Sequence, residues 1–205
     1  MQLETKDGQL VIISGSSRCG KTAKATRLVR GFETVFVWDI EAQWCKQKGY
    51  KKITSITEFK NLVIAGKMGR YAYVSGGNFK ADFESFCMCV SYYGTYFGAC
   101  AVVAEELADV TSTAKAGDYW GMLCRRGLKR GISIFAISQR WAEADKTALG
   151  NATDFYLFRM ASGSDIDYMS KKTRVPVSRL EHLKPLDFIH YNALTGETLS
   201  SKVTF

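Results

Sequence analysis

A chain of 205 residues, of which 46% are apolar and 23% charged, can bury a sizeable core and has the composition of a globular protein. These proportions exclude a disordered chain, and no run approaches the roughly 20 apolar residues that a membrane-spanning helix needs. The net charge of +8 favours a polyanionic partner, nucleic acid before an anionic membrane. Six scattered cysteines and a polar N-terminus unlike a secretory signal predict free thiols in a reducing cytoplasm.

Short apolar runs alternate with helical patterns along the chain, which is typical of an α/β fold with a mostly parallel sheet and helices on both faces. The predicted strands are Gln9–Ser14, Thr34–Asp39, Tyr71–Ser75, Ala99–Ala104, Ile132–Ser138 and Asp154–Met160. The predicted helices are Lys21–Arg30, Thr57–Ala65, Lys80–Tyr93 and a stretch within Gly117–Arg130. Phe188–Asn192 and Thr198–Phe205 flank a turn and predict a C-terminal β-hairpin. Because no linker-like segment interrupts this order, residues 1–205 are predicted to form a single domain.

The segment between the first predicted strand and helix has the pattern of a phosphate-binding P-loop. Gly15 and Gly20 let the backbone curl with its N–H groups pointing inward, and the following helix N-terminus adds partial positive charge. Lys21 can reach the β- and γ-phosphates of a nucleotide, and the Thr22 hydroxyl can ligate Mg²⁺. The pattern therefore predicts binding of ATP with Mg²⁺ by Gly15, Ser16, Ser17, Arg18, Cys19, Gly20, Lys21 and Thr22.

Two side chains inside the P-loop carry predictions of their own. Arg18 either adds positive charge beside the phosphates or points outward from a variable position of the loop. Cys19 lies near a helix N-terminus and Lys21, an environment that lowers the pKa of a thiol and increases its reactivity. We therefore expect alkylation of Cys19 to inhibit nucleotide binding and bound ATP to protect the thiol.

Two adjacent carboxylates follow the apolar run Ala99–Ala104. This run predicts a buried central strand, and ligand sites in open α/β sheets lie at the carboxyl edge of such strands. One acid, Glu105, can hold Mg²⁺ directly or through water, and the next, Glu106, can orient and deprotonate the water that attacks the γ-phosphate. The alternative is a pair of solvated acids at the end of a strand.

A second buried strand, Ile132–Ser138, is followed by an amide and a guanidinium. Gln139 can hydrogen-bond both the γ-phosphate and the attacking water, and so report whether the γ-phosphate is present. The alternative is a strand-end amide that is satisfied by loop backbone. Arg140 is a candidate for contact with the phosphates bound by its own subunit.

The segments GSSRCGKT, AVVAEE and ISIFAISQR, with the basic RRGLKRG before the last, form a joint pattern over Gln9 to Met160. This pattern resembles the FtsK/HerA superfamily of ring-forming translocases, and most of all the genome-packaging ATPases of membrane-containing icosahedral viruses with double-jelly-roll capsid proteins. The "SQR" ending is the discriminating part. The chain departs from the family at Glu105, where aspartate is usual, and at Trp141, where packaging members often have proline.

The resemblance implies a RecA-like P-loop core that assembles into a ring, a pentamer or hexamer, and drives double-stranded DNA into a preformed capsid. Lys21 and Thr22 match the phosphate-binding lysine and the Mg²⁺-ligating hydroxyl, Glu106 the catalytic glutamate, and Gln139 the polar sensor. The implied partners are double-stranded DNA, further copies of the chain and capsid vertex proteins. The implied location is the cytoplasm of an infected cell, or a packaging vertex of the virion.

Ring ATPases place an arginine from one subunit against the γ-phosphate of its neighbour, and the candidates here are Arg125, Arg126 and Arg130. If residues 123–130 are helical, Arg126, Lys129 and Arg130 share one face, which suits a neighbouring active site or a DNA phosphate track. The long connection 107–131 and the lysine-rich loop 46–52 are candidates for loops that enter the pore of the ring. The candidate DNA-binding lysines are Lys48, Lys51, Lys52, Lys115 and Lys129.

Three other functions compete with a DNA-translocating ATPase. Many P-loop kinases for nucleotides or small molecules have about this length, but a kinase does not need adjacent strand-end glutamates. A non-packaging assembly or secretion motor, such as a filamentous-phage extrusion protein, normally carries a membrane segment. A nucleotide-gated binding protein without useful turnover does not require Glu106 and Gln139.

Overall fold

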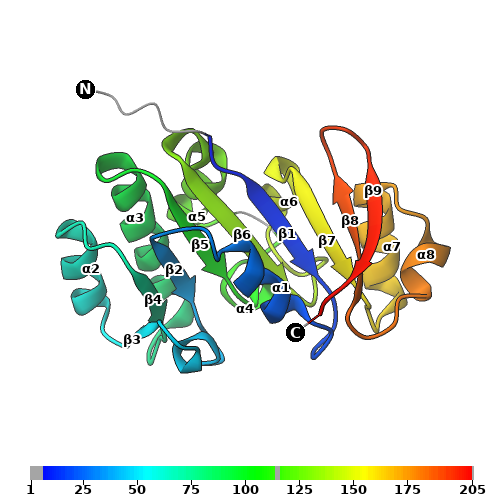
Figure 1. Cartoon of the computed structure of the whole chain (residues 1–205). Coiled ribbons are helices and arrows are strands. Elements are labelled where there is room, and N and C mark those ends of the chain that lie inside the picture. Colours follow the sequence, from blue (N-terminus) through cyan, green and yellow to red (C-terminus); the bar gives the residue numbers. More distant parts are fainter. Residues whose placement is uncertain (1–6, 114–115, 205) are drawn as a thin grey trace.

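Nine strands form one sheet in the computed structural model, which describes residues 7–113 and 116–204 (Figure 1). Their order across the sheet is β3-β4-β2-β5-β6-β1-β7-β8-β9. The strands are β1 (Leu10–Ser14), β2 (Val35–Trp38), β3 (Lys51–Ile53), β4 (Arg70–Tyr73), β5 (Cys100–Ala104), β6 (Ile132–Ser138), β7 (Asp154–Phe158), β8 (Asp187–Asn192) and β9 (Thr198–Lys202). All pairs from β3 to β7 are parallel, and only the β7–β8 and β8–β9 pairs are antiparallel.

The helices connect these parallel strands and cover the sheet. They are α1 (Lys21–Leu28), α2 (Ile56–Ile64), α3 (Phe79–Tyr96), α4 (Leu107–Val110), α5 (Asp118–Arg126), α6 (Lys146–Asn151), α7 (Gly163–Thr173) and α8 (Val177–Glu181), with 3₁₀ turns η1 (Trp44–Lys46) and η2 (Leu128–Arg130). Ser55 caps α2, because its hydroxyl accepts a hydrogen bond from the Glu58 N–H at 3.3 Å. In the described part of the chain, no helix combines the length and apolar character that crossing a bilayer requires.

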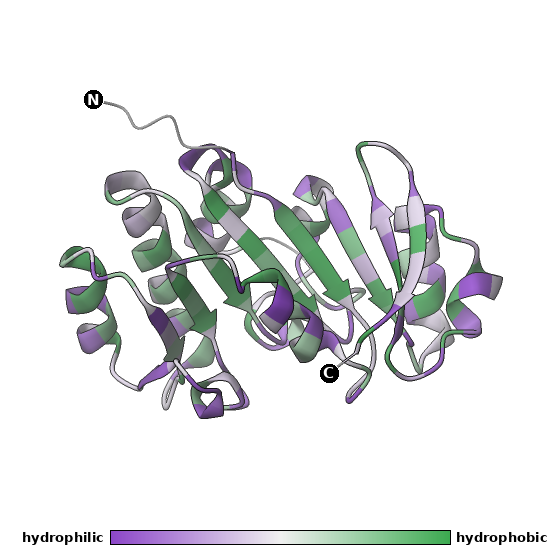
Figure 2. Cartoon of the chain, in the orientation of Figure 1, coloured by the Kyte–Doolittle hydropathy of each residue, from purple (hydrophilic) through white to green (hydrophobic). Residues whose placement is uncertain are grey.

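The central strands are apolar on both sides because the sheet is covered on both faces (Figure 2). Alternate residues enter two separate cores: Ile12 and Val102 pack on the side of α2, α3 and α5, whereas Val11 and Val103 pack on the side of α1. The predicted α/β fold, with its mostly parallel sheet and C-terminal hairpin, is therefore confirmed. The predicted strands and the major helices agree with the structure to within a few residues at each end.

Two predicted loops are wrong in part. Residues 46–52 do not form one free loop, because η1 ends at Lys46 and Lys51 and Lys52 belong to β3, which pairs with β4 at the outer edge of the sheet. The described part of the connection 107–131 is largely helical, with α4, α5 and η2.

Residues 123–130 do not form one continuous helix, which was the condition for a shared basic face. Helix α5 ends at Arg126, and Gly127 starts a tighter 3₁₀ turn, where a β-carbon would lie 2.5 Å from the Leu123 carbonyl oxygen. Arg126, Lys129 and Arg130 therefore do not line one face of a single helix. This basic segment precedes β6, and the Leu128 carbonyl accepts a hydrogen bond from the Gly8 N–H at 2.8 Å, just before β1 begins. It lies at the amino edge of the sheet.

Candidate active site

The P-loop leaves β1 at the carboxyl edge of the sheet and enters α1 at Lys21. Gly15 has a φ of 152° and Gly20 a φ of 107°, both in the region that favours glycine. A β-carbon on Gly15 would lie 2.6 Å from Cβ of Phe158 and 2.8 Å from the Cys19 sulfur, so the loop has no room for a side chain there. The backbone N–H and the hydroxyl of Ser16 both donate to the Arg159 carbonyl, at 2.8 and 3.0 Å. Strand β7 thus anchors the loop.

The Lys21 ammonium lies inside the P-loop, and the residue is only 7% exposed. It donates hydrogen bonds to the carbonyl oxygens of Gly15 and Ser16, both at 2.8 Å. Burial lowers its pKa, while the negative charges of Glu105 and Glu106 oppose that change. The amine is therefore held at the centre of the loop, facing the two strand-end acids.

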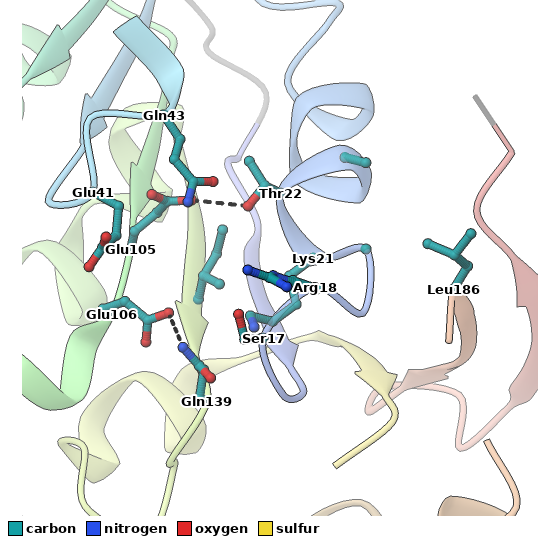
Figure 3. A pocket seen from close by; sticks show the side chains of 13 residues that line it. Ser17, Arg18, Lys21, Thr22, Glu41, Gln43, Glu105, Glu106, Gln139 and Leu186 are labelled. Carbon is teal, nitrogen blue, oxygen red and sulfur yellow. Dashed lines mark hydrogen bonds between the residues drawn. The ribbon is translucent and has the colours of Figure 1, made fainter. Parts of the chain in front are cut away.

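Glu105 is buried at the end of β5, between the P-loop helix and the segment after β2. Its Oε1 accepts a hydrogen bond from the Trp44 indole Nε1 at 2.8 Å. The same oxygen accepts one from the Thr22 hydroxyl at 3.4 Å (Figure 3). Burial raises the pKa of Glu105 to about 7, and the neighbouring Asp39 carboxylate adds to this, whereas the two hydrogen bonds act in the opposite direction.

A third acid, Asp39, follows β2 and shapes the wall beside Glu105. Its fully buried carboxylate accepts three backbone hydrogen bonds, from the N–H groups of Gln43, Trp44 and Cys45, at 2.8, 3.1 and 2.9 Å. These bonds hold the turn that begins at Trp44, so they fix the indole that donates to Glu105.

Glu106 lies next to Gln139 at the carboxyl ends of the neighbouring strands β5 and β6. Its φ of 46° is left-handed, a strained conformation for a side chain this large, and such strain is concentrated at functional sites. The Gln139 amide nitrogen donates to Oε1 of Glu106 at 2.9 Å (Figure 3). The structure therefore brings together the two side chains that the sequence placed at separate strand ends.

These residues line one cavity of about 560 Å³, within the range of roughly 300–1,000 Å³ of small-molecule sites. Its lining comprises Ser17, Arg18, Gly20, Lys21, Thr22, Ala23, Glu41, Gln43, Glu105, Glu106, Ile137, Gln139 and Leu186. The loop amides and Lys21 suit a polyphosphate. The Thr22 hydroxyl and the Glu105 carboxylate form an oxygen donor set that fits Mg²⁺.

The structure separates other predicted site residues from this cavity. Arg140 forms an exposed ion pair with Glu143 at 2.9 Å and lines a smaller acidic depression beside Glu106. The segment 125–130, which carries Arg125, Arg126 and Arg130, lies at the amino edge of the sheet, away from the P-loop of its own chain. Of the candidate DNA-binding lysines, Lys48, Lys51, Lys52 and Lys129 are exposed, and Lys115 lies outside the described residues.

The expected lowering of the Cys19 thiol pKa is wrong. The residue is buried at 3% exposure, and burial raises the pKa of the thiol more strongly than the Lys21 charge and the backbone hydrogen bonds lower it. The thiol packs against the backbone of Gly15. Its closeness to a helix N-terminus is therefore outweighed by desolvation.

Sequence reasoning missed Asp39, Trp44, Arg159 and Leu186 as parts of the site. Asp39 carried a usable signal, because it ends an apolar strand as Glu105 does. Trp44, Arg159 and Leu186 had none, since an indole, a backbone carbonyl and an isolated leucine become part of the site only through tertiary contacts.

The nine-stranded sheet carries a P-loop after β1, two glutamates after β5 and a glutamine after β6. This arrangement is the fold of a P-loop NTPase. Among solved structures, the genome packaging NTPase B204 of Sulfolobus turreted icosahedral virus 2, in complex with AMPPCP, is 13% identical with a TM-score of 0.78, covering 96% of this chain and 98% of that one. The DNA-packaging ATPase B204 of Sulfolobus turreted icosahedral virus is 15% identical with a TM-score of 0.74, covering 99% of this chain and 100% of that one. The predicted resemblance to viral packaging ATPases is therefore confirmed for the fold.

Two further comparisons define how far the likeness extends. Protein P9 of Pseudoalteromonas phage PM2 is 31% identical over 114 residues, which are 55% of this chain and 50% of that protein, so the match spans half the length of this curated relative. The bacterial conjugative coupling protein TrwB shares the fold at 7% identity, with a TM-score of 0.64 and coverage of 99% of this chain and 89% of that one. No protein-family model matches the chain.

Proposed function

We propose that this protein is an ATP-hydrolysing motor that packages double-stranded viral DNA into a preformed capsid. The observation that carries the proposal is the Glu106–Gln139 hydrogen bond of 2.9 Å beside a P-loop cavity. A carboxylate at this position can orient and deprotonate the attacking water of hydrolysis, and a kinase does not need two adjacent glutamates at the end of one strand. The likeness to the B204 packaging NTPases supports the same function.

In this proposal the P-loop amides and Lys21 bind the β- and γ-phosphates of ATP. Glu106 is the general base, and Gln139 exchanges its bond to Glu106 for one to the γ-phosphate when ATP is present. Breaking that bond frees the carboxylate to accept a proton from the attacking water. Catalysis is thereby coupled to the presence of the γ-phosphate.

Thr22 and Glu105 are the residues that would hold Mg²⁺. When bound, the metal would neutralise negative charge on the phosphates. Glu105 contributes a carboxylate whose orientation is already fixed by the Trp44 indole.

A ring of copies, five or six, accounts for the basic segment at the amino edge of the sheet. Arg125 and Arg126 are exposed, and both lie far from the P-loop of their own chain, which favours a role at the site of a neighbouring subunit. Arg130 is a third candidate for this role. Arg140 pairs with Glu143 and lines a depression together with Glu106 and Gln139, so it stays a candidate for contact with the phosphates bound by its own subunit.

The partners in this proposal are DNA, further copies of the chain and the capsid vertex, in the cytoplasm of an infected cell or at the virion vertex. The net charge of +8 supports binding to a phosphate backbone. The exposed lysines Lys48, Lys52 and Lys129 are candidates for contacts with DNA, as are Lys51, which is partly neutralised by Glu58 at 2.8 Å, and Lys115. Such contacts are independent of base sequence and weaken as salt rises.

The test is steady-state ATP hydrolysis at low salt, with and without double-stranded DNA, by the wild type, Lys21→Ala and Glu106→Gln. We expect DNA to stimulate turnover and the stimulation to fade as salt rises. Lys21→Ala loses ATP binding, whereas Glu106→Gln binds ATP and hydrolyses it at least about 100-fold more slowly. Wild-type turnover in Glu106→Gln would remove this residue from the catalytic role, and phosphate transfer to an added acceptor without DNA stimulation would favour the kinase.

A further inference from the structure

Leu186 is held against the P-loop by the segment that leads into β8. Its backbone N–H donates to the Cys19 carbonyl at 3.2 Å, and its own carbonyl accepts the Val203 N–H at 2.9 Å, so loop, turn and C-terminal segment are tied together. A β-carbon on Gly20 would lie 3.2 Å from Cδ2 of Leu186. The leucine has a φ of 71°, a strained value for a branched side chain, which the surrounding contacts maintain.

The cavity has two chemically different ends, and Leu186 marks one of them. Figure 3 shows Glu105, Glu106 and Gln139 on one side of the P-loop and Leu186 across the loop from them. A triphosphate whose γ-phosphate faces Glu106 and Gln139 runs along the loop amides away from these acids. The nucleoside therefore leaves the loop on the side where Leu186 lies.

We propose that Leu186 is the wall of a nucleobase subsite that binds the face of the base by apolar contact and does not read its hydrogen-bonding edge. This inference rests on the proposed function, because it requires a nucleoside triphosphate in the cavity. Leu186 is only partly buried, so hydrocarbon remains available for a ligand to cover. The lining residues at the start of α1, Gly20 and Ala23, have no polar side-chain atoms, and the polar side chains of Ser17 and Arg18 lie in the loop between Leu186 and the acids (Figure 3).

The absence of a polar side chain at these described positions determines the expected selectivity. A site rejects the wrong base strongly only when it presents groups that hydrogen-bond the right one. An apolar wall contributes a similar contact to adenine, guanine and cytosine, because every base has a flat face. The subsite therefore adds affinity for a nucleoside over bare polyphosphate, and the motor accepts several nucleoside triphosphates as fuel.

The experiment measures equilibrium binding of ATP, GTP, CTP and inorganic tripolyphosphate by calorimetry, with Mg²⁺ present. Five proteins are compared: wild type, Leu186→Gly, Leu186→Met, Leu194→Gly and Lys21→Ala. Glycine accepts the left-handed backbone and removes only the side chain, and methionine restores an apolar surface. Leu194, 80% exposed in the β8–β9 turn, is the matched control for a leucine-to-glycine change in the same hairpin.

We expect the wild type to bind the three nucleotides with Kd values that agree within about threefold, and Leu186→Gly to weaken all three by roughly tenfold. Tripolyphosphate binding should not change, and Leu186→Met and Leu194→Gly should bind like the wild type. Equal losses for ATP and tripolyphosphate in Leu186→Gly would overturn the subsite, because the leucine would then act on the loop. Unchanged ATP binding, or a preference for one base of about 100-fold, would overturn it too.

The same data separate this inference from the proposed function. Wild-type binding of tripolyphosphate that is abolished in Lys21→Ala supports the P-loop site independently of Leu186. If the wild type bound neither tripolyphosphate nor any of the nucleotides, the proposed function would fail, and the subsite with it.

Discussion

The raised pKa of Glu105 predicts that the stability of the folded protein depends on pH. Glu105→Gln should remove this part of the pH dependence. Burial raises the pKa of Glu105 from 4.5 to about 7 in the folded protein, and each tenfold change in proton affinity corresponds to about 1.4 kcal/mol. Between these two pH values the folded state binds more protons at this site than the unfolded state does. The free energy of unfolding therefore falls as pH rises from 4.5 to 7, by roughly 3 kcal/mol from this group when Mg²⁺ and nucleotide are absent.

The assay is urea unfolding of the wild type and Glu105→Gln at pH 4.5, 6 and 8, with a chelator and without nucleotide. Glutamine keeps the shape and the carbonyl acceptor for Trp44 but cannot ionise. Between pH 4.5 and 8, the free energy of unfolding of the wild type should fall by about 2–3 kcal/mol relative to that of Glu105→Gln. Saturating Mg²⁺ should reduce that change, because a bound cation stabilises the carboxylate.

Glu106→Gln is the matched control, because it removes the same charge from the adjacent, less buried position. It should keep most of the wild-type pH dependence. A stability difference between Glu105→Gln and wild type that stays constant from pH 4.5 to 8 would refute the reasoning, since burial would then not hold the proton on Glu105.

Three further predictions concern the surroundings of the P-loop. Trp44→Phe removes the indole N–H that donates to Glu105 at 2.8 Å and leaves an aromatic ring. The ratio of the ATP Kd without Mg²⁺ to the ATP Kd with Mg²⁺ should therefore be about tenfold smaller in this variant than in the wild type. An unchanged ratio would contradict this. Gly15→Ala, with its β-carbon 2.6 Å from Phe158, should lose at least about 2 kcal/mol of unfolding free energy in urea, whereas Gly31→Ala, with open space around it, should not. Because Cys19 is buried and the pKa of its thiol is raised, iodoacetamide should label it at least about 100-fold more slowly in the native protein than in urea. Mass spectrometry of the modified peptides measures the two rates, and equal rates would contradict the burial argument.

The sequence predicted the part of the site that is local or that follows from parallel strands. The P-loop lies within eight consecutive residues, and Glu106 and Gln139 each follow an apolar strand, so a parallel sheet brings them to the same edge. Trp44 reaches Glu105 across 61 residues of sequence through a turn that Asp39 holds, and no periodicity encodes that contact. The prediction of a low thiol pKa for Cys19 was wrong for a related reason. The burial of Cys19 depends on Phe158 and the C-terminal segment rather than on its place in the motif.

The anchoring of the P-loop has a consequence for how the protein matures on the ribosome. The loop is synthesised before β6, β7 and Leu186, yet β1 pairs with β6 and β7, and the loop itself is tied to the backbone of Arg159 and Leu186. A nascent chain therefore carries the complete motif long before it can shape it. We expect nucleotide affinity to appear only after residues 154–204 have left the exit tunnel.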